Sequence, residues 1–520
     1  MSQKKLAKNI SVMSIAILLS RILGLVRDQV MAFFFGTSFL NDAFNVAYNI
    51  PNLLRRLFGE GALSAAFVPI YNEIGIKEGK EKQIDFALNV LSILTLFLAA
   101  LTFLGMVFTP WIVRLLYPGL PENTTIFAIK LSRIIFPYLF YIGLSSTLIA
   151  VLNSHDIFFL TGLSSAVLNV GMIAFVLIPQ WIFDPDPEKL IIWAGWGVFL
   201  GGFLQTVINL PYLKRIGYRM RFILKFSSQA LSALWKRFIP SMIGIGIREI
   251  NLIADALMAS FLPVGSITAL GFGNRLMQLP LGIFAISTGT ALLPMFSRHV
   301  SNREYKELSE GLRFASTSLA CIILPITMLI ALLGKDFVAL LFQHGAFDAR
   351  ATLMTNQALF YYSLGLIFYS LNQTLTPLFY AQGDTRTPVV IAAWMVGLNI
   401  VLNYILMLFM QHRGLALSTP ITALVNYFLL LWLLHKKLPE ISLTGLASNL
   451  IKPLLICALL YLPLYYLNTL FPVQGKLALG IKSLLFSSLA LILFFLLAML
   501  FKIEYISSIR KQLWSKLVRR

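Results

Sequence analysis

The sequence is poor in charge and in long polar stretches. Only 12% of its 520 residues are Asp, Glu, Lys or Arg, whereas 58% are hydrophobic, and the mean hydropathy is +0.80. Soluble domains carry about a quarter charged residues, so this composition excludes an ordinary soluble protein. Because no polar segment of domain size interrupts the apolar runs, we predict an all-α polytopic membrane protein.

Cysteine is nearly absent, and so are the common catalytic motifs. The two cysteines, Cys321 and Cys457, lie inside apolar runs, which excludes a disulfide framework or a cysteine metal cluster. The sequence contains no G-x-x-x-x-G-K-[ST] phosphate loop, no H-E-x-x-H and no G-x-S-x-G. The five histidines are isolated, and the loops are too short for a glycosyltransferase domain. We therefore predict that the chain is not an enzyme.

Acidic residues are also scarce, with 22 Asp and Glu against 42 Lys and Arg and a net charge of +20. The basic residues lie in short loops beside apolar runs, which is the positive-inside pattern of a membrane protein and argues against nucleic-acid binding. This pattern predicts that both termini are cytoplasmic, with the basic tail 503–520 on the inner leaflet. The loops assigned to the outside hold few basic residues: Arg114, Lys189, Lys335, Arg350, Arg413, Lys476 and Lys482.

The apolar runs predict about fourteen transmembrane helices, at ~20 residues per span. An even number of spans agrees with both termini lying on one side of the membrane. We place the spans at residues 10–35, 42–72, 86–110, 126–152, 158–181, 191–213, 234–262, 266–297, 312–333, 352–381, 387–410, 414–435, 450–470 and 479–502.

An internal repeat predicts the domain organisation. The segment AAFVPIYN around Pro69 resembles ALLPMFSR around Pro294, and PWIVRLLYPG resembles KDFVALLFQHG at the same offset. Equivalent spans are six apart, so the two copies have the same orientation. We expect an N-terminal lobe (1–225, spans 1–6) and a C-terminal lobe (226–440, spans 7–12) around a central cationic cavity, and then spans 13–14 with the basic tail (441–520).

Buried charges in the first two spans are the main functional signal. An ionised side chain near the middle of a bilayer costs at least ~2.5–3.5 kcal/mol. The planar guanidinium group donates hydrogen bonds in pairs and stays protonated, which suits phosphate. Arg21, Arg27 and Arg55 together therefore suggest recognition of a phosphate or pyrophosphate. The alternative is a structural salt bridge between Arg21 and Asp28, which are seven residues apart on one helix face.

Several other polar residues in the spans have both a functional and a structural interpretation. Arg56 and Glu60 have the i,i+4 spacing of an ordinary helical ion pair. Asp42 is expected near the outer surface, Arg248 and Glu249 belong to span 7, and Arg275 is the only charge in span 8. A second set has the oxygen ligands for a monovalent cation, with helix–helix hydrogen bonding as the alternative: Asp255, Asn399, Asn403 and Thr422.

The motifs SRILGLVRD, NDAF and PNLLRRLFGEGALSAAFVPI resemble the signature of the MurJ/MviN lipid II flippases. These belong to the multidrug/oligosaccharidyl-lipid/polysaccharide exporter superfamily. The resemblance extends over essentially the whole chain, including GDTRTP and the last two spans. It implies that lipid II, the undecaprenyl-pyrophosphate-linked disaccharide-pentapeptide, is moved from the inner to the outer leaflet of the bacterial cytoplasmic membrane. This step supplies peptidoglycan for the cell wall and cell shape.

The resemblance also implies a mechanism and a set of sites. Transport is expected to proceed by alternating access without ATP, driven by membrane potential or an ion gradient, with the lipid tail in a groove of spans 13 and 14. A sodium ion is the candidate coupling ion, near Asp255, Asn399, Asn403 and Thr422, and no other cofactor is implied. The substrate-binding residues implied are Arg21, Arg27, Asp28, Asp42, Arg55, Glu60 and Arg275.

The chain departs from the family pattern around Arg275. Some members have acidic residues there, whereas this chain has Asn274 and Gln278. Because span 7 carries Arg248 and Glu249, we hypothesise that the acidic charge has moved between helices.

A flippase for another polyprenyl-linked oligosaccharide is an open alternative, because it would use the same pyrophosphate anchor. Other functions fit the sequence less well. A cation-coupled multidrug exporter would favour an acidic, aromatic cavity. A scaffold for cell-wall enzymes would not need buried arginines, and a polyprenyl-dependent transferase would need a cluster of catalytic carboxylates in a loop. We expect membrane lipids and lipid II as partners of a monomer, in association with the cell-wall synthesis machinery.

Overall fold

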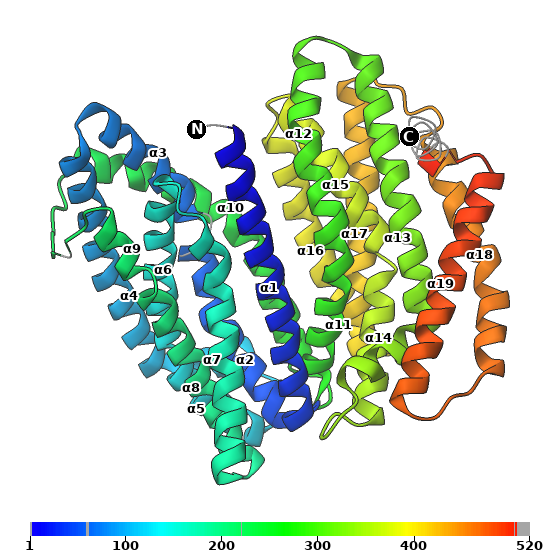
Figure 1. Ribbon diagram of the computed structural model, residues 1–520, viewed down its shortest axis with the longest axis horizontal. Coiled ribbons are helices and arrows are strands. Elements are labelled where there is room, and N and C mark those ends of the chain that lie inside the picture. Colours follow the sequence, from blue (N-terminus) through cyan, green and yellow to red (C-terminus); the bar gives the residue numbers. More distant parts are fainter. Residues whose placement is uncertain (1–2, 59–61, 220, 504, 507–520) are drawn as a thin grey trace. The chain divides into compact units, whose positions relative to one another are not determined.

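The computed structural model describes residues 3–58, 62–219, 221–503 and 505–506. Within these ranges the chain is built from α-helices with one short π-helical segment, and it contains no strand (Figure 1). The chain forms two compact units, each described by itself below. The first consists of Met1–Thr268 and His344–Phe347, and the second of Ala269–Gln343 and Asp348–Arg520.

The first unit is a helical bundle in which apolar faces of helices distant in sequence meet. α1 packs on α7, α7 on α8, α2 on α5, and α3 on α10. Its core is filled mainly by aliphatic and aromatic side chains such as Phe35, Leu131 and Phe136. Its helices are α1 (Gln3–Phe35), α2 (Phe39–Phe58), α3 (Ala62–Lys77), α4 (Lys80–Leu116), α5 (Glu122–Ile135), α6 (Pro137–Ser154), α7 (Phe159–Phe183), α8 (Pro187–Val207), α9 (Leu210–Arg215) and α10 (Gln229–Ala259).

The α7–α8 contact depends on glycine. A Cβ at Gly171 would lie 3.0 Å from the Cα of Gly201, and a Cβ at Gly197 would lie 3.0 Å from the Cα of Met172. Small residues let membrane helices approach closely, where dispersion and weak hydrogen bonds accumulate. These glycines therefore hold α7, and through it α1, in place.

We expect Gly197→Leu to lower the thermal stability of the purified protein, because the new side chain must push α8 away from α7. Overpacking of this kind costs about 1–3 kcal/mol. The matched control is Gly397→Leu on α16 (Arg386–Met410), where nothing lies within 4 Å of the added Cβ. Equal melting temperatures for the two variants, measured in one detergent, would contradict the packing role of Gly197.

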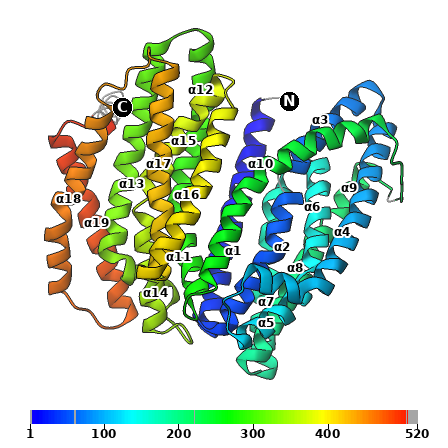
Figure 2. The ribbon, with the colours of Figure 1, turned by 180° about the vertical axis from the view of Figure 1, so that it is seen from behind.

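The second unit is also a bundle (Figure 2). α12 packs on α15, α16 on α17, and α15 on α17, around a core that includes Phe296, Leu378 and Phe379. Its helices are α11 (Ser266–Pro280, whose first three residues belong to the first unit), the π-helical segment Leu281–Ala285, α12 (Ile286–Ser301), α13 (Tyr305–Phe342), α14 (Ala349–Ser363), α15 (Leu366–Ala381), α16, α17 (His412–Lys437), α18 (Leu446–Leu470) and α19 (Lys476–Leu500).

The last two helices, α18 and α19, pack against each other and against α13. Cys321 and Cys457, both free and buried, lie in this contact with Phe494. Figure 1 shows α18 and α19 in orange and red beside α13. Much of their remaining surface is apolar and exposed, as at Leu462, Leu484 and Leu485, which suits a helix pair that faces lipid.

The GDTRTP segment joins α15 to α16 and is tied to the end of α17. The Asp384 carboxylate accepts a hydrogen bond from the backbone N–H of Thr387 at 2.9 Å and pairs with the Lys437 ammonium. These contacts hold the pKa of Asp384 down at about 2. The turn needs a left-handed residue, and Gly383 supplies it with φ of +77°.

Ten helices within the described residues are long and apolar enough to cross a membrane. The predicted count of fourteen thus stays a prediction. The four predicted spans outside this set are 10–35, 42–72, 234–262 and 352–381. The first three carry several charges, and the fourth divides into α14 and α15, neither longer than 16 residues. Charge and helix breaks therefore remove 42–72, 234–262 and 352–381 from a count based on length and hydropathy, whereas several side chains of 10–35 lie outside the described part of the chain.

The packing units differ from the lobes predicted from the repeat. α10 lies after the predicted boundary at 225/226, yet it packs against α3, α4 and α2 of the first unit. The predicted separate part 441–520 contains α18 and α19, which share the α13 core of the second unit. The two units are defined by packing, whereas the lobes 1–225 and 226–440 are defined by the sequence repeat. The units therefore do not test the lobes, which stay a prediction. The long helices that the repeat pairs, α4 and α13, have 37 and 38 residues.

Candidate functional site

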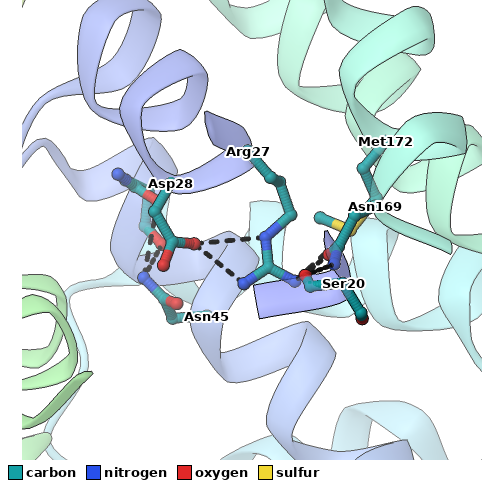
Figure 3. Close-up of polar contacts among 7 residues, drawn as sticks. Ser20, Arg27, Asp28, Asn45, Asn169 and Met172 are labelled. Carbon is teal, nitrogen blue, oxygen red and sulfur yellow. Dashed lines mark hydrogen bonds and ion pairs between the residues drawn. The ribbon is translucent and has the colours of Figure 1, made fainter. Parts of the chain in front are cut away.

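The Arg27 side chain ties α1 to α7 in the first unit. Its Nε and Nη2 donate to Oδ1 of Asp28 at 3.1 and 2.8 Å, and its Nη1 donates to Oδ1 of Asn169 at 3.0 Å. Asn169 in turn donates to the backbone carbonyl of Ser20 at 3.2 Å. Figure 3 shows the Arg27 guanidinium between Asp28 and Asn169. Two helices thus share one hydrogen-bonded network.

This network differs from the pairing considered for Arg21 and Asp28. Asp28 bonds to its neighbour Arg27, and the side chains of this pair are only 13% and 8% exposed. Arg21, by contrast, is exposed. A charged pair away from water needs good hydrogen-bond geometry to persist, and Arg27 and Asp28 have it. The substrate-binding roles of Arg21, Arg27 and Asp28 stay predictions.

Asp42, at the start of α2, is buried. Its carboxylate accepts hydrogen bonds from the backbone N–H groups of Gly265 and Thr268 and from the Thr268 hydroxyl, at 2.5, 2.9 and 2.6 Å. A carboxylate at the first turn of a helix satisfies N–H groups that have no intrahelical partner. Asp42 therefore fixes the start of α11 against α2.

At the other end of α2, Arg55 is half-buried and Arg56 reaches α10. Arg56 Nη1 lies 3.4 Å from Oε2 of Glu249, and the two side chains are 37% and 6% exposed. Glu60, the predicted i,i+4 partner of Arg56, lies outside the described residues. Arg56 and Glu249 line a cavity of about 100 Å³ together with Asn49, Ile50, Leu53, Leu116, Tyr117, Leu252, Ile253 and Ala256.

We expect Arg56→Gln to lower the melting temperature of the purified protein more than Glu249→Gln does. The reason is burial: Arg56→Gln removes the cation that offsets a buried carboxylate, whereas Glu249→Gln leaves a guanidinium that reaches solvent. The double variant should be more stable than Arg56→Gln alone. A double variant whose loss equals the sum of the two single losses would show that the pair is not coupled.

The remaining predicted residues are distributed over both units. The Arg248 side chain lies outside the described part of the chain. Arg275 on α11 belongs to the second unit, where it is half-buried. The two residues noted as departures, Asn274 and Gln278, hydrogen-bond to each other. Whether Arg275 joins Arg21, Arg27 and Arg55 in one cavity stays a prediction.

The polar residues suggested for a cation form a buried network in the second unit. Asn403 donates to Oδ1 of Asn399 at 2.9 Å, and Asn399 donates to the Thr422 hydroxyl at 3.3 Å. Asp255 lies in the first unit and accepts from Asn251 at 3.3 Å. In the described ranges, no group of three or more His, Cys, Asp or Glu residues is placed to hold a metal ion. The sodium site stays a prediction.

Asn169, the partner of Arg27, is not among the residues predicted from the sequence. Asn169 lies in an apolar run of α7, and a single amide side chain among apolar residues is the signal that points to it. Glu249 was expected as a secondary polar residue of span 7, and the structure shows that it is the partner of Arg56.

Comparisons with known proteins give one consistent family. The sequence model of the lipid II flippase MurJ family matches residues 31–486. A probable lipid II flippase MurJ of Buchnera aphidicola subsp. Schizaphis graminum is 35% identical over 436 residues, which is 83% of each chain. The probable lipid II flippase MurJ of Bdellovibrio bacteriovorus is 30% identical over 519 residues, 98% of this chain and 97% of the relative.

Solved structures agree with this assignment. A structure of lipid II flippase MurJ in an inward closed conformation is similar with a TM-score of 0.79 and 27% identity, over 94% of this chain and 98% of that one. An inward-facing multidrug transporter of the MATE family has a TM-score of 0.68 at 14% identity, over 84% of this chain and 99% of its own, which shows a shared fold only. The chain belongs to the lipid II flippase MurJ family.

Proposed function

We propose that this protein moves lipid II from the inner to the outer leaflet of the bacterial cytoplasmic membrane and so supplies peptidoglycan synthesis. The observation that supports this most is the set of arginines in the first two helices of an otherwise apolar chain. Arg21 is exposed and Arg55 is half-buried, and both lie in segments predicted to span the membrane, where charge is costly unless it serves a ligand or a partner. A pyrophosphate matches such guanidinium groups.

The residues divide into two roles in this proposal. Arg21 and Arg55 contact the pyrophosphate, with Arg275 and Glu60 as further substrate-binding residues. Arg27 and Asp28 position α1 on α7, and Asp42 positions α2 on the start of α11. Arg56, Glu249 and Arg248 are secondary polar residues that hold α2 and α10.

The energetics fit transport without ATP. Moving an anionic headgroup outward across an inside-negative membrane is favourable by ~2.3 kcal/mol per charge per 100 mV. A sodium ion bound near Asp255, Asn399, Asn403 and Thr422 would let an ion gradient supply part of the free energy for transport. The cycle alternates access between two sides and makes or breaks no covalent bond, so the proposal includes no enzymatic activity and no cofactor.

The proposal also includes orientation and assembly. Both termini lie in the cytoplasm. The protein works as a monomer that associates with the cell-wall synthesis machinery. Spans 13 and 14, which are α18 and α19, hold the prenyl tail.

The test supplies this chain to cells depleted of their own lipid II flippase. Lipid II on the outer leaflet is then measured by cleavage with an enzyme added outside the cells. We expect the wild-type chain to restore cleavage. A well-expressed chain that restores no cleavage would contradict the proposal and would point to another polyprenyl-linked oligosaccharide as cargo.

A further inference from the structure

A polar cavity in the second unit lies apart from the arginine-rich helices. Its volume is about 400 Å³, and it is formed by the beginning of α13 and the connection between α17 and α18. Its lining residues are charged or polar except Gly445: Lys306, Ser309, Glu310, Arg313, Glu440, Ser442, Thr444 and Gly445. Nothing in the transport proposal uses this cavity.

The wall of the cavity is held by specific contacts. The backbone N–H of Ser442 donates to the Ser309 hydroxyl at 3.0 Å, and the N–H of Thr444 donates to the Ser442 hydroxyl at 3.3 Å. Gly445 has φ of +79° and precedes the first turn of α18. A Cβ at Gly445 would lie 3.9 Å from Nη1 of Arg313, so the guanidinium stands next to the start of this helix. Hydrogen bonds therefore hold the α17–α18 connection against α13 on this side of the cavity.

The charges in the wall have both signs. Lys306 and Arg313 are cationic, and Glu310 and Glu440 are anionic. No ion pair of Lys306, Glu310 or Glu440 occurs among the contacts of the described residues, and all three side chains are exposed. A purely anionic ligand would be repelled by the two carboxylates, and a purely cationic ligand would be repelled by the two basic groups. A ligand with a phosphate and an ammonium group matches both.

The surroundings add an apolar part to the ligand. α18 starts at the cavity and runs for 25 residues, about 37 Å, with exposed apolar residues one to three turns beyond it at Ile451, Leu454 and Leu455. On α13, Phe314 follows Arg313 and contacts Tyr505 edge-on at 5.6 Å between ring centroids. The polar cavity therefore opens beside a lipid-facing apolar surface.

We propose that this cavity binds the headgroup of a zwitterionic glycerophospholipid of the phosphoethanolamine type. The phosphate lies toward Arg313 and the N-terminal turn of α18, where the helix dipole favours an anion. The ammonium group lies toward Glu310 and Glu440, and the acyl chains follow Ile451, Leu454 and Leu455. A bilayer lipid, distinct from the transported one, thus binds at the end of the α18–α19 pair where α18 begins.

The test measures binding of short-chain lipids to the purified, detergent-solubilised full chain. The probes are dioctanoyl phosphatidylethanolamine, the matching phosphatidylcholine and phosphatidylglycerol, and free phosphoethanolamine. We expect phosphatidylethanolamine to bind most tightly, because only it offers ammonium N–H donors, a phosphate and acyl chains together. Tighter binding of phosphatidylglycerol would overturn the zwitterion assignment, and equal binding of free phosphoethanolamine would identify a soluble ligand rather than a lipid.

Variants distinguish the two halves of the headgroup. Arg313→Gln should weaken phosphatidylethanolamine binding by about tenfold or more, as expected for the loss of a charge-assisted hydrogen bond. The double variant Glu310→Gln/Glu440→Gln should remove the preference over phosphatidylcholine while leaving phosphate binding. Glu307→Gln, on α13 but outside the cavity lining, is the matched control and should bind like the wild type. Unchanged binding by a folded Arg313→Gln variant would overturn the proposal.

Discussion

Replacing Arg27 by alanine is expected to abolish lipid II transport and to destabilise the protein. Arg27 offsets the charge of Asp28, whose side chain is 8% exposed, and it holds α7 through Asn169. Removing one partner of a buried ion pair costs about 3–5 kcal/mol, because the other charge keeps its desolvation penalty. The measurements are the melting temperature in detergent and lipid II exposure in flippase-depleted cells.

A second variant separates stability from function at this pair. Arg27→Ala/Asp28→Ala removes both charges, so the melting temperature should recover toward the wild-type value. Transport should stay impaired if α1 must be held on α7 in one register. Arg133→Ala, which changes an exposed arginine on α5, controls for loss of a single positive charge. If Arg27→Ala were as stable as this control, the buried-pair account would be wrong.

Arg21→Ala and Arg55→Ala are expected to reduce transport by about tenfold to a hundredfold each while leaving the protein folded. This range corresponds to about 1.5–3 kcal/mol for hydrogen bonds to a charged group. Their expected stability differs from that of Arg27→Ala, because Arg21 is exposed and Arg55 is only half-buried.

Lysine variants test the chemistry of these two contacts. Arg21→Lys and Arg55→Lys keep the positive charge but lose the planar fork that pairs with two phosphate oxygens. We expect intermediate transport. Wild-type transport by both lysine variants would mean that charge alone matters, and wild-type transport by both alanine variants would remove Arg21 and Arg55 from the substrate site.

The sequence was sufficient to predict the fold class, because this prediction depends on hydropathy and charge content along the chain. Apolar runs of span length and the lack of charge predict membrane helices irrespective of how those helices pack. The same local evidence marked the charges of the first two spans as unusual, since a charge inside an apolar run of span length is costly without a partner or a ligand.

Partner identities were harder to predict because they depend on tertiary contacts. Arg27 bonds to Asn169, 142 residues away, and Arg56 pairs with Glu249 on α10. The i,i+4 and i,i+7 rules favour partners within one helix, so they suggested Glu60 for Arg56 and Asp28 for Arg21. The partners of Asp42, the backbone N–H groups of Gly265 and Thr268, also lie far along the chain, 223 and 226 residues away.

Reconstitution of the purified chain in vesicles tests the central claim most directly. Lipid II with a fluorescent label would be placed in the leaflet that corresponds to the cytoplasmic side, and its arrival in the other leaflet would be followed with a membrane-impermeant quencher. We predict arrival that is faster than in protein-free vesicles, accelerated by an inside-negative potential, and lost with Arg21→Ala. Arrival at the protein-free rate, by a chain shown to be folded and correctly inserted, would contradict the account.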